Sequence, residues 1–337
     1  MRKIVGLLTA LALLFMPVAC AEDPVALQSE NFVFPEDTAF NLSFNANKTF
    51  RILQLTDVHY DQSNYGIGIM QNIEKLVNLS RPDLIVLTGD IVSGQPATYR
   101  WIIFASFLSQ LHYPYVIALG NHDSEHFLTR RHLYEMIRHF PNCENEEFED
   151  GSAYLPGDMA VEIKKNASSD VGALLYLFDT NEYSSPEKQL GIRAAQTDWF
   201  EKKDRYYKDK GVTGNIPGLV FMHVPLTEYR TGASLPDASL VGARGEKEYT
   251  GLDSHAFFEA LKRAGDIQGV FCGHDHFNEY VLDYQGIALC YGRKSGSHNT
   301  YQRYPTGARV IDLHEGEAGF FTFILECDGS RHHEYLY

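Results

Sequence analysis

The stretch DLIVLTGD, residues 83–90, is a nearly continuous apolar run that ends in glycine and aspartate. Runs of this kind are typical of parallel strands that are covered by other layers on both faces. Similar segments lie at 50–56 (FRILQLT) and at 115–120 (YVIALG). Segment 67–79 carries apolar residues at helical spacing, and 97–111 is predicted to be a buried helix. Strand and helix therefore alternate, which predicts two right-handed βαβ units in succession.

The second half of the chain changes from this rhythm to short strands. After a predicted helix at 126–139, the pattern indicates helices at about 193–207 and 255–264, with Ser254 as the N-cap of the latter and Gly265 at its end. The expected strands are 152–163, 171–179, PGLVFM (217–222), QGVFC (268–272), EYVLD (279–283), GIALCY (286–291), GARVIDL (307–313) and GFFTFIL (319–325). Because no linker or second compositional regime interrupts the chain, we expect one α/β domain with two sheets.

The N-terminal residues 1–21 are typical of a signal peptide. Arg2 and Lys3 form a basic start, and the apolar segment from Ile4 to Val18 is too short to span a membrane. Ala19-Cys20-Ala21 offers small residues at a cleavage site. The sequence therefore predicts export through a secretory route.

Other features fit this interpretation. Four asparagines lie in glycosylation tripeptides, which predicts a glycoprotein: Asn41, Asn47, Asn78 and Asn166. A lipid anchor at Cys20 is an alternative that Pro17 disfavours. Beyond the signal peptide no apolar stretch is long enough to span a bilayer, so we expect an extension at 22–48 and the domain at 49–337. The destination stays open among extracellular, periplasmic, and vacuolar or lysosomal compartments.

Charge and cysteine content limit the partners. The formal net charge is −15, and loss of the cations Arg2 and Lys3 with the signal peptide takes it to −17. A field of this sign repels nucleic acid and anionic lipid, so we expect a small substrate and no nucleic-acid partner. The acidic segment CENEEFEDG (143–151) is predicted to be a solvated loop. The remaining cysteines are interpreted as small hydrophobic residues, with one disulfide bridge as the alternative: Cys143, Cys272, Cys290 and Cys327.

Acidic, amide or imidazole side chains follow five of the predicted strands. They are Asp57-Val-His59, Gly89-Asp90, Gly120-Asn121-His122-Asp123, His223 and Gly273-His274-Asp275-His276. Each alone has an ordinary explanation as a helix cap, a turn or a buried histidine. Because ligands bind outside the carboxyl ends of strands in open α/β sheets, their shared position indicates one site.

The residue types indicate the chemistry of that site. Carboxylate, imidazole and amide donors without a thiolate suit Mn, Fe(II) or Zn. Two such ions about 3.5–4 Å apart can share a carboxylate and stabilise both the attacking and the leaving oxygen of an in-line displacement. A single strand-end aspartate, Asp90, is the natural bridge.

The ordered set DxH…GD…GNHD…H…GHxH resembles the signature of the calcineurin-like metallophosphoesterases over residues 50–325. The C-terminal part looks most similar to the short purple-acid-phosphatase-like branch that lacks an N-terminal β-domain. The resemblance implies a four-layer α/β/β/α sandwich of two mixed β-sheets flanked by helices, with a dinuclear metal site at the strand ends. It also implies in-line attack on phosphorus by a metal-bridged hydroxide.

The resemblance also assigns roles to individual residues. The first metal would be held by Asp57, His59 and His276, and Asp90 would bridge. The second metal would be held by Asn121, His223 and His274. His122 would face the leaving group, Asp123 would orient His122, and Asp275 would support a ligand or face solvent.

Several functions stay open at this point. We expect a phosphomonoesterase, with a phosphodiesterase acting on nucleotide or lipid headgroup esters as the alternative within the class. A catalytically inactive binding module with the same fold is the alternative from another class, although no ligand is missing. An oxygen-activating di-metal protein would need helical Glu-x-x-His pairs, which the sequence lacks.

The sequence also predicts the kind of metal centre. In purple acid phosphatases a tyrosinate three residues after the bridging aspartate binds Fe(III), whereas this chain has Ser93 there. His59 occupies a position where those enzymes have no histidine ligand. A neutral imidazole favours two divalent ions over Fe(III), so we expect a colourless or pale enzyme. Tyr60 could supply a phenolate only by turning inward, and the strand pleat should point it away.

Residues that would select the substrate are harder to assign. Tyr60, Asp61 and Asn64 could line the cleft, and Arg293 and Lys294 could meet a phosphate oxygen. A role as solvated loop residues explains each of them equally well.

Overall fold

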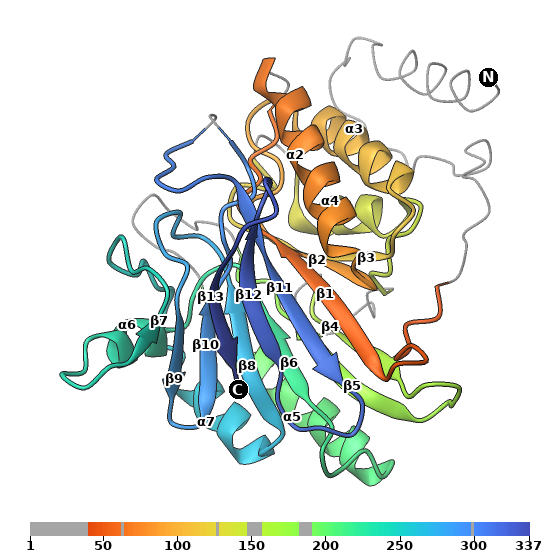
Figure 1. Ribbon diagram of the computed structural model, residues 1–337, viewed down its shortest axis with the longest axis vertical. Helices are drawn as coiled ribbons and strands as arrows, with labels where there is room; N and C mark the ends of the chain where they lie inside the picture. Colours follow the sequence, from red (N-terminus) through yellow and green to blue (C-terminus); the bar gives the residue numbers. More distant parts are fainter. Residues whose placement is uncertain (1–39, 62–63, 126–127, 147–156, 182–190, 298–299) are drawn as a thin grey trace. The chain divides into compact units, whose positions relative to one another are not determined.

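The computed structural model describes residues 40–61, 64–125, 128–146, 157–181, 191–297 and 300–337 (Figure 1). All of them belong to one compact unit, Asp37–Tyr337. The predicted signal peptide, including Cys20, and most of the 22–48 extension lie outside the described residues.

The first sheet has six strands in the order β13-β12-β11-β1-β2-β3. Their bounds are β1 Thr49–Leu55, β2 Leu84–Thr88, β3 Tyr115–Ala118, β11 Gly307–His314, β12 Phe321–Glu326 and β13 Arg331–Leu336. The strands β1, β2 and β3 are parallel, with Leu53 beside Ile85 and Val86 beside Val116. The remaining strands pair antiparallel to extend the sheet beyond β1. The predicted strand–helix alternation is confirmed.

The second sheet has seven strands in the order β4-β5-β6-β8-β10-β9-β7. Their bounds are β4 Met159–Lys164, β5 Val171–Leu177, β6 Gly218–Phe221, β7 Leu240–Val241, β8 Ile267–Cys272, β9 Val281–Tyr284 and β10 Ile287–Tyr291. The central strands β5, β6, β8 and β10 are parallel, and the outer pairings are antiparallel. Both sheets are therefore mixed.

Helices cover the outer faces of both sheets, as Figure 1 shows. Their bounds are α2 Asn64–Ser80, α3 Ala97–Gln110 and α4 Arg130–Ile137 on the first sheet, and α5 Ala194–Asp209, α6 Thr227–Ala233 and α7 His255–Ala264 on the second. Across the described residues, no helix combines the length and apolar character needed to cross a membrane.

Strand β2 is apolar throughout because both of its faces are buried. Ile85 and Leu87 pack into the cluster beneath α2 and α3, whereas Leu84 and Val86 point into the cluster between the two sheets. Because successive side chains point to opposite faces, a strand buried on both faces needs an unbroken apolar run. The expected four-layer sandwich is confirmed.

Some expected elements differ from the structure. Helix α4 begins at Arg130 rather than at 126, because the Thr129 hydroxyl accepts a hydrogen bond from the His132 amide and caps it there. Ser254 precedes α7 as expected, but its side chain does not cap the helix and instead donates to Glu228. The short elements α6 and β7 and the edge strand β13 were not predicted. Strand β13, RHHEYL, is largely exposed and polar, so its sequence lacks the alternation of apolar residues that would predict a strand.

The four described cysteines are free, as the interpretation as small hydrophobic residues requires. Cys272 and Cys290 are fully buried. No disulfide joins the cysteines within the described part of the chain.

A buried arginine joins the two sheets. Arg309, on β11, is fully buried and donates to the Tyr291 carbonyl at 2.7 Å and the Glu279 carbonyl at 3.1 Å, both beside the second sheet. It also donates to the Thr322 hydroxyl on the neighbouring strand. These bonds satisfy a guanidinium that would otherwise be costly to bury, and they fix how the sheets face each other.

Candidate metal centre

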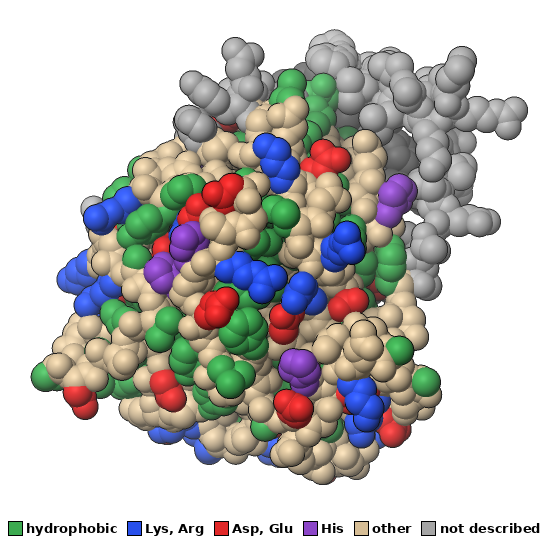
Figure 2. Space-filling model, in the orientation of Figure 1, with side chains coloured by type: hydrophobic (Ala, Val, Ile, Leu, Met, Phe, Trp, Pro, Cys, Tyr) green, Lys and Arg blue, Asp and Glu red, His purple; other side chains and the backbone are tan. Residues whose placement is uncertain are grey.

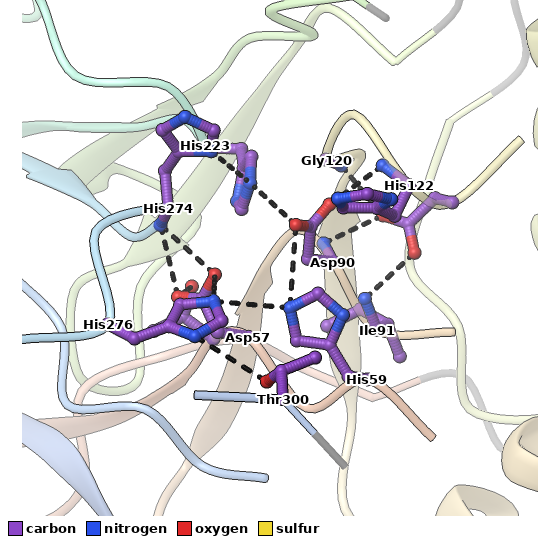
Figure 3. A network of polar contacts seen from close by, with 12 residues as sticks. Asp57, His59, Asp90, Ile91, Gly120, His122, His223, His274, His276 and Thr300 are labelled. Carbon is purple, nitrogen blue, oxygen red and sulfur yellow. Dashed lines mark hydrogen bonds and ion pairs between the residues drawn. The ribbon is translucent and has the colours of Figure 1, made fainter. Parts of the chain in front are cut away.

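The polar side chains that follow the strands converge between the two sheets, as expected. From the first sheet come Asp57 and His59 after β1, Asp90 after β2, and Asn121 after β3. From the second sheet come His223 after β6, and His274 and His276 after β8. Figure 3 labels six of these residues, and their side chains surround one region: Asp57, His59, Asp90, His223, His274 and His276.

Asp57, His59 and His276 form the first ligand group. One donor atom from each lies within 4.8 Å of the others, and all three side chains are buried. The Nε2 atoms of His59 and His276 are 3.2 Å apart, and His276 Nε2 lies 3.4 Å from Asp57 Oδ1. Two imidazole nitrogens and a carboxylate oxygen thus point at one position, which is the donor set of a transition-metal site.

Asp90, His223 and His274 form the second group, again with donor atoms within 4.8 Å of one another. His223 Nε2 lies 3.3 Å from Asp90 Oδ2 and 3.3 Å from His274 Nδ1. The two histidines come from adjacent parallel strands, so the sheet sets their spacing.

One oxygen of Asp90 lies between the two groups. Asp90 Oδ2 is 3.6 Å from His59 Nε2 in the first group and 3.3 Å from His223 Nε2 in the second. The other oxygen accepts a hydrogen bond from the His122 amide at 2.9 Å. This bond orients the carboxylate so that Oδ2 can face both groups at once.

Asn121 supplies an observation that tests whether metals fit. Its side chain is only 4% exposed, and neither Oδ1 nor Nδ2 has a hydrogen-bond partner among the described residues. A buried amide without partners costs free energy unless something else binds it. The amide oxygen of Asn121 could bind a metal ion, as the resemblance implies for the second group, so the residues present fit a dinuclear centre.

Two of the candidate histidine ligands, His59 and His274, are neutral, whereas His223 would have to release a proton to bind a metal. Burial lowers the pKa of His59 well below its ordinary value and that of His274 to about 3, so both rings are neutral ligands. For His223, burial also lowers the pKa, but the charge and hydrogen bond of Asp90 outweigh it and raise the pKa to about 9. Burial would raise the pKa of Asp90, but His223 opposes this and holds it well below the ordinary value.

The backbone is strained at four of these positions. Asp57, His59, Asp90 and His274 have positive φ angles of 51°, 47°, 51° and 80°. Left-handed backbone costs a residue with a side chain about 1–3 kcal/mol, and it persists only where the surrounding structure enforces it. In the turns after β1, β2 and β8, this left-handed backbone points the ligand side chains inward.

Further hydrogen bonds orient the ligands from behind. The ring of His223 pairs through Nδ1 with the Thr88 carbonyl at 2.8 Å, and that of His276 with the Tyr301 carbonyl at 2.9 Å. The Asp57 carboxylate accepts from the Thr56 hydroxyl at 2.9 Å and from the His274 amide at 3.1 Å. Such partners fix the ring orientation and leave the opposite nitrogen to the metal.

Glu125, a residue that sequence reasoning missed, holds the side chain of His122. Its Oε1 lies 2.5 Å from His122 Nδ1, and its other oxygen accepts from the Gly94 amide at 3.3 Å. The hydrogen bond to Glu125 raises the pKa of His122 to about 9, against the effect of burial. The acidic residue three positions after His122 was the available signal.

The expected role of Asp123 is corrected. Its buried carboxylate accepts from the backbone amides of Asp90, Ile91, Val92 and Gly120, at 3.0, 2.8, 3.1 and 2.7 Å. Asp123 therefore joins the loops after β2 and β3, and Glu125 rather than Asp123 holds the His122 ring. Burial and the nearby Asp90 raise the pKa of Asp123 to about 6.

Arg293 and Lys294 do not serve as exposed phosphate contacts. Arg293 is 3% exposed and pairs with Glu279 and Glu326. Lys294 is 2% exposed and donates to the backbone carbonyl of Asp57 at 2.9 Å, so it supports the turn after β1. Neither interpretation from sequence, a phosphate contact or a solvated loop residue, describes them, because both cations are buried and paired inside the fold.

The other residues singled out from sequence have clear positions. Tyr60 is buried in the cluster beneath the helices, with its ring 5.6 Å from that of Phe104, so it points away from the site as the pleat predicted. Asp61 is half-buried, and the side chain of Asn64 lies outside the described residues. Asp275 is buried and accepts from the Tyr291 hydroxyl at 2.6 Å.

Known proteins resemble this chain in sequence and fold. It is 29% identical over 293 residues to "Probable inactive purple acid phosphatase 29" of Arabidopsis thaliana, covering 76% of this chain and 74% of that protein. It is 26% identical over 305 residues to "Phosphatase DCR2" of Saccharomyces cerevisiae, covering 77% of this chain and 50% of that protein. The crystal structure of a dimetal phosphatase from Danio rerio shares the fold, with a TM-score of 0.58 and 13% identity over 85% of this chain and 98% of that one.

The family model of the calcineurin-like phosphoesterases matches residues 50–278, more than half of the chain. This span contains every residue of the two ligand groups and Asn121. The chain therefore belongs to the calcineurin-like phosphoesterase family, whose members use a dinuclear metal centre.

Proposed function

We propose that the chain is an exported phosphomonoesterase that works with two divalent ions, chosen from Mn, Fe and Zn. The observation that carries the proposal is the Asp90 oxygen between two ligand groups, and the buried Asn121 amide, which has no hydrogen-bond partner among the described residues, supports it. We infer the preference for monoesters from the word phosphatase in the names of two relatives, "Probable inactive purple acid phosphatase 29" and "Phosphatase DCR2".

When bound, two divalent ions would supply Lewis acidity at the phosphoryl oxygens and a water nucleophile near neutral pH. Asp57, His59 and His276 would hold one ion, Asn121, His223 and His274 would hold the other, and Asp90 would contact both. The buried position of the carboxylates strengthens their interaction with cations, because little water screens it.

We assign protonation of the leaving group to His122. Its side chain is 38% exposed and lies beside His59, with ring centroids 5.5 Å apart. Glu125 binds Nδ1, so Nε2 is the nitrogen that faces the substrate. With its pKa raised to about 9, the ring is protonated at neutral pH and loses its proton as the pH rises through that value.

An inactive binding module is the second candidate, because three similar proteins of Arabidopsis thaliana carry the words "Probable inactive" in their names. In this chain all seven expected ligands are present, six of them form the two ligand groups, and the partly exposed His122 lies beside His59. We therefore favour an active enzyme.

Export is supported by the positions of the predicted glycosylation sites. The asparagines of all four tripeptides are exposed: Asn41, Asn47, Asn78 and Asn166.

A small substrate rather than nucleic acid is supported by the surface charge. On the face in Figure 2, cationic and anionic side chains are interspersed without a broad cationic area.

Substrate panels test the proposed activity. The metal-reconstituted protein should hydrolyse p-nitrophenyl phosphate and leave bis-p-nitrophenyl phosphate essentially intact. Release of p-nitrophenol measures both. Turnover of the diester alone would support the phosphodiesterase alternative, and no turnover on either ester with both metals bound would support the inactive module.

Replacing Asp90 by Asn should abolish activity and lower the metal content. One carboxylate faces both ligand groups, so its neutralisation weakens both sites at once. Metal analysis of the purified variant measures this, with the exposed Asp237→Asn as the matched control. Two retained metals and near-normal turnover would contradict the bridging role.

Replacing His122 by Ala should keep both metals but lower kcat by roughly 10²–10⁴-fold, the scale of general acid catalysis. The loss should be smaller for aryl than for alkyl esters, because aryl leaving groups need less protonation. Glu125→Gln should lower kcat less and move the alkaline limb of the pH–rate profile to lower pH, because Glu125 is the main cause of the raised pKa. Equal losses on both ester types, or an unmoved alkaline limb, would contradict this role.

The purified enzyme should be colourless or pale, activated by divalent ions and inhibited by chelators. Ser93 cannot supply a tyrosinate, and Tyr60 is 5% exposed and packed away from the metals. A visible absorption spectrum of the loaded protein checks this. A strong charge-transfer band that disappears in Tyr60→Phe would overturn it.

A further inference from the structure

Two exposed tyrosines lie directly against the ligand histidines. Tyr301 stacks on His276 with ring centroids 4.1 Å apart and an interplanar angle of 18°. Tyr249 lies 5.7 Å from His274, centroid to centroid. Their exposed fractions are 50% and 49%, so about half of each residue faces solvent beside the metal centre.

The backbone of Tyr249 is held by the aspartate between the two ligand histidines. The Tyr249 amide donates to both carboxylate oxygens of Asp275, at 3.2 and 3.1 Å. Asp275 also accepts from the Tyr291 hydroxyl, and the carboxylate is only 4% exposed. Asp275, between the two ligand histidines, thus holds the backbone segment that carries the Tyr249 ring, and this ring lies beside His274.

Tyr301 is held by the same motif from the other side. Its carbonyl pairs with His276 Nδ1 at 2.9 Å. Its hydroxyl donates to Glu246 Oε1 at 3.4 Å, and that oxygen also accepts from the Phe277 amide at 2.7 Å. Glu246 and Tyr249 belong to one loop. The bonds of Glu246 therefore join this loop to the segment that carries Tyr301 and to Phe277, directly after the GHDH motif.

The chemistry of these positions favours an uncharged planar group. His276 stacks on the Tyr301 ring and the Phe277 ring lies 5.0 Å from it at 83°, so an incoming ring can contact only the half of Tyr301 that stays exposed. Aromatic pairs in such offset contacts gain free energy beyond simple area burial. The nearby Glu246 disfavours a leaving group that carries further negative charge.

We propose that Tyr249 and Tyr301 form an aromatic clamp for the organic part of the substrate. The substrate class is then a phosphomonoester whose leaving group contains an uncharged planar ring, either an aryl group or a nucleoside. The inference rests on the proposed function, because the metal centre must first bind the phosphoryl group.

Ligand binding tests the clamp without requiring turnover. The metal-reconstituted protein is titrated calorimetrically with phenylphosphonate, ethylphosphonate and inorganic phosphate. Tyr249→Ala and Tyr301→Ala should each weaken phenylphosphonate binding by roughly 3- to 10-fold and leave the other two affinities unchanged. Tyr206→Ala, at a tyrosine 52% exposed on α5, is the matched control and should change none of them. Adenosine 5′-phosphate is titrated into the metal-loaded His122→Ala protein with and without each tyrosine substitution. A lower affinity in the tyrosine variants would indicate a nucleoside, and an unchanged affinity would indicate an aryl group.

The outcomes separate the clamp from the proposed activity. A selective loss of phenylphosphonate affinity in a protein that shows no turnover would support the clamp and contradict the enzyme. Normal turnover with an unchanged preference for phenylphosphonate in both variants would contradict the clamp and leave the enzyme standing. An equal loss for all three ligands would also overturn the clamp, because it would mean that the tyrosines support the metal ligands instead.

Discussion

A single carboxylate oxygen, Asp90 Oδ2, has to lie within reach of ligands from both sheets, and the arrangement of the domain serves this requirement. His59 belongs to the first sheet and His223 to the second, and both face this oxygen at 3.6 and 3.3 Å. Two sheets can contribute to one centre only if their strand ends meet. The apolar cluster between the sheets and the buried Arg309 that spans them hold the ends together.

The close approach of the turns imposes a second constraint. A side chain at Gly120 would place its Cβ 2.2 Å from the Asp90 amide nitrogen and 2.4 Å from its Oδ1, so only glycine fits there. Asp123 then joins the two turns through four backbone amides. The GNHD segment therefore supplies the bonds that hold Asp90 in its left-handed conformation, beside the proposed ligand Asn121 and the proposed proton donor His122.

Much of this could be predicted from the sequence, for a physical reason. A strand buried on both faces needs a continuous apolar run, so β1, β2, β3, β6 and β8 were visible, and the polar residues after them marked the site. The partners of individual side chains could not be predicted, because they depend on how loops pack. Arg293 and Lys294 look like phosphate contacts in sequence, yet ion pairs and a backbone carbonyl bury them. The available signal for Glu125 was its position three residues after His122, but this spacing alone does not show that the two side chains meet.

The central claim is that two metals share Asp90, and anomalous X-ray scattering from crystals of the Mn-loaded protein tests it most directly. The account predicts two manganese peaks about 3.5–4 Å apart. Asp90 should lie between them, and the Asn121 amide oxygen should contact the ion beside His223 and His274. A single peak, or two peaks with Asp90 bound to only one of them, would contradict the account.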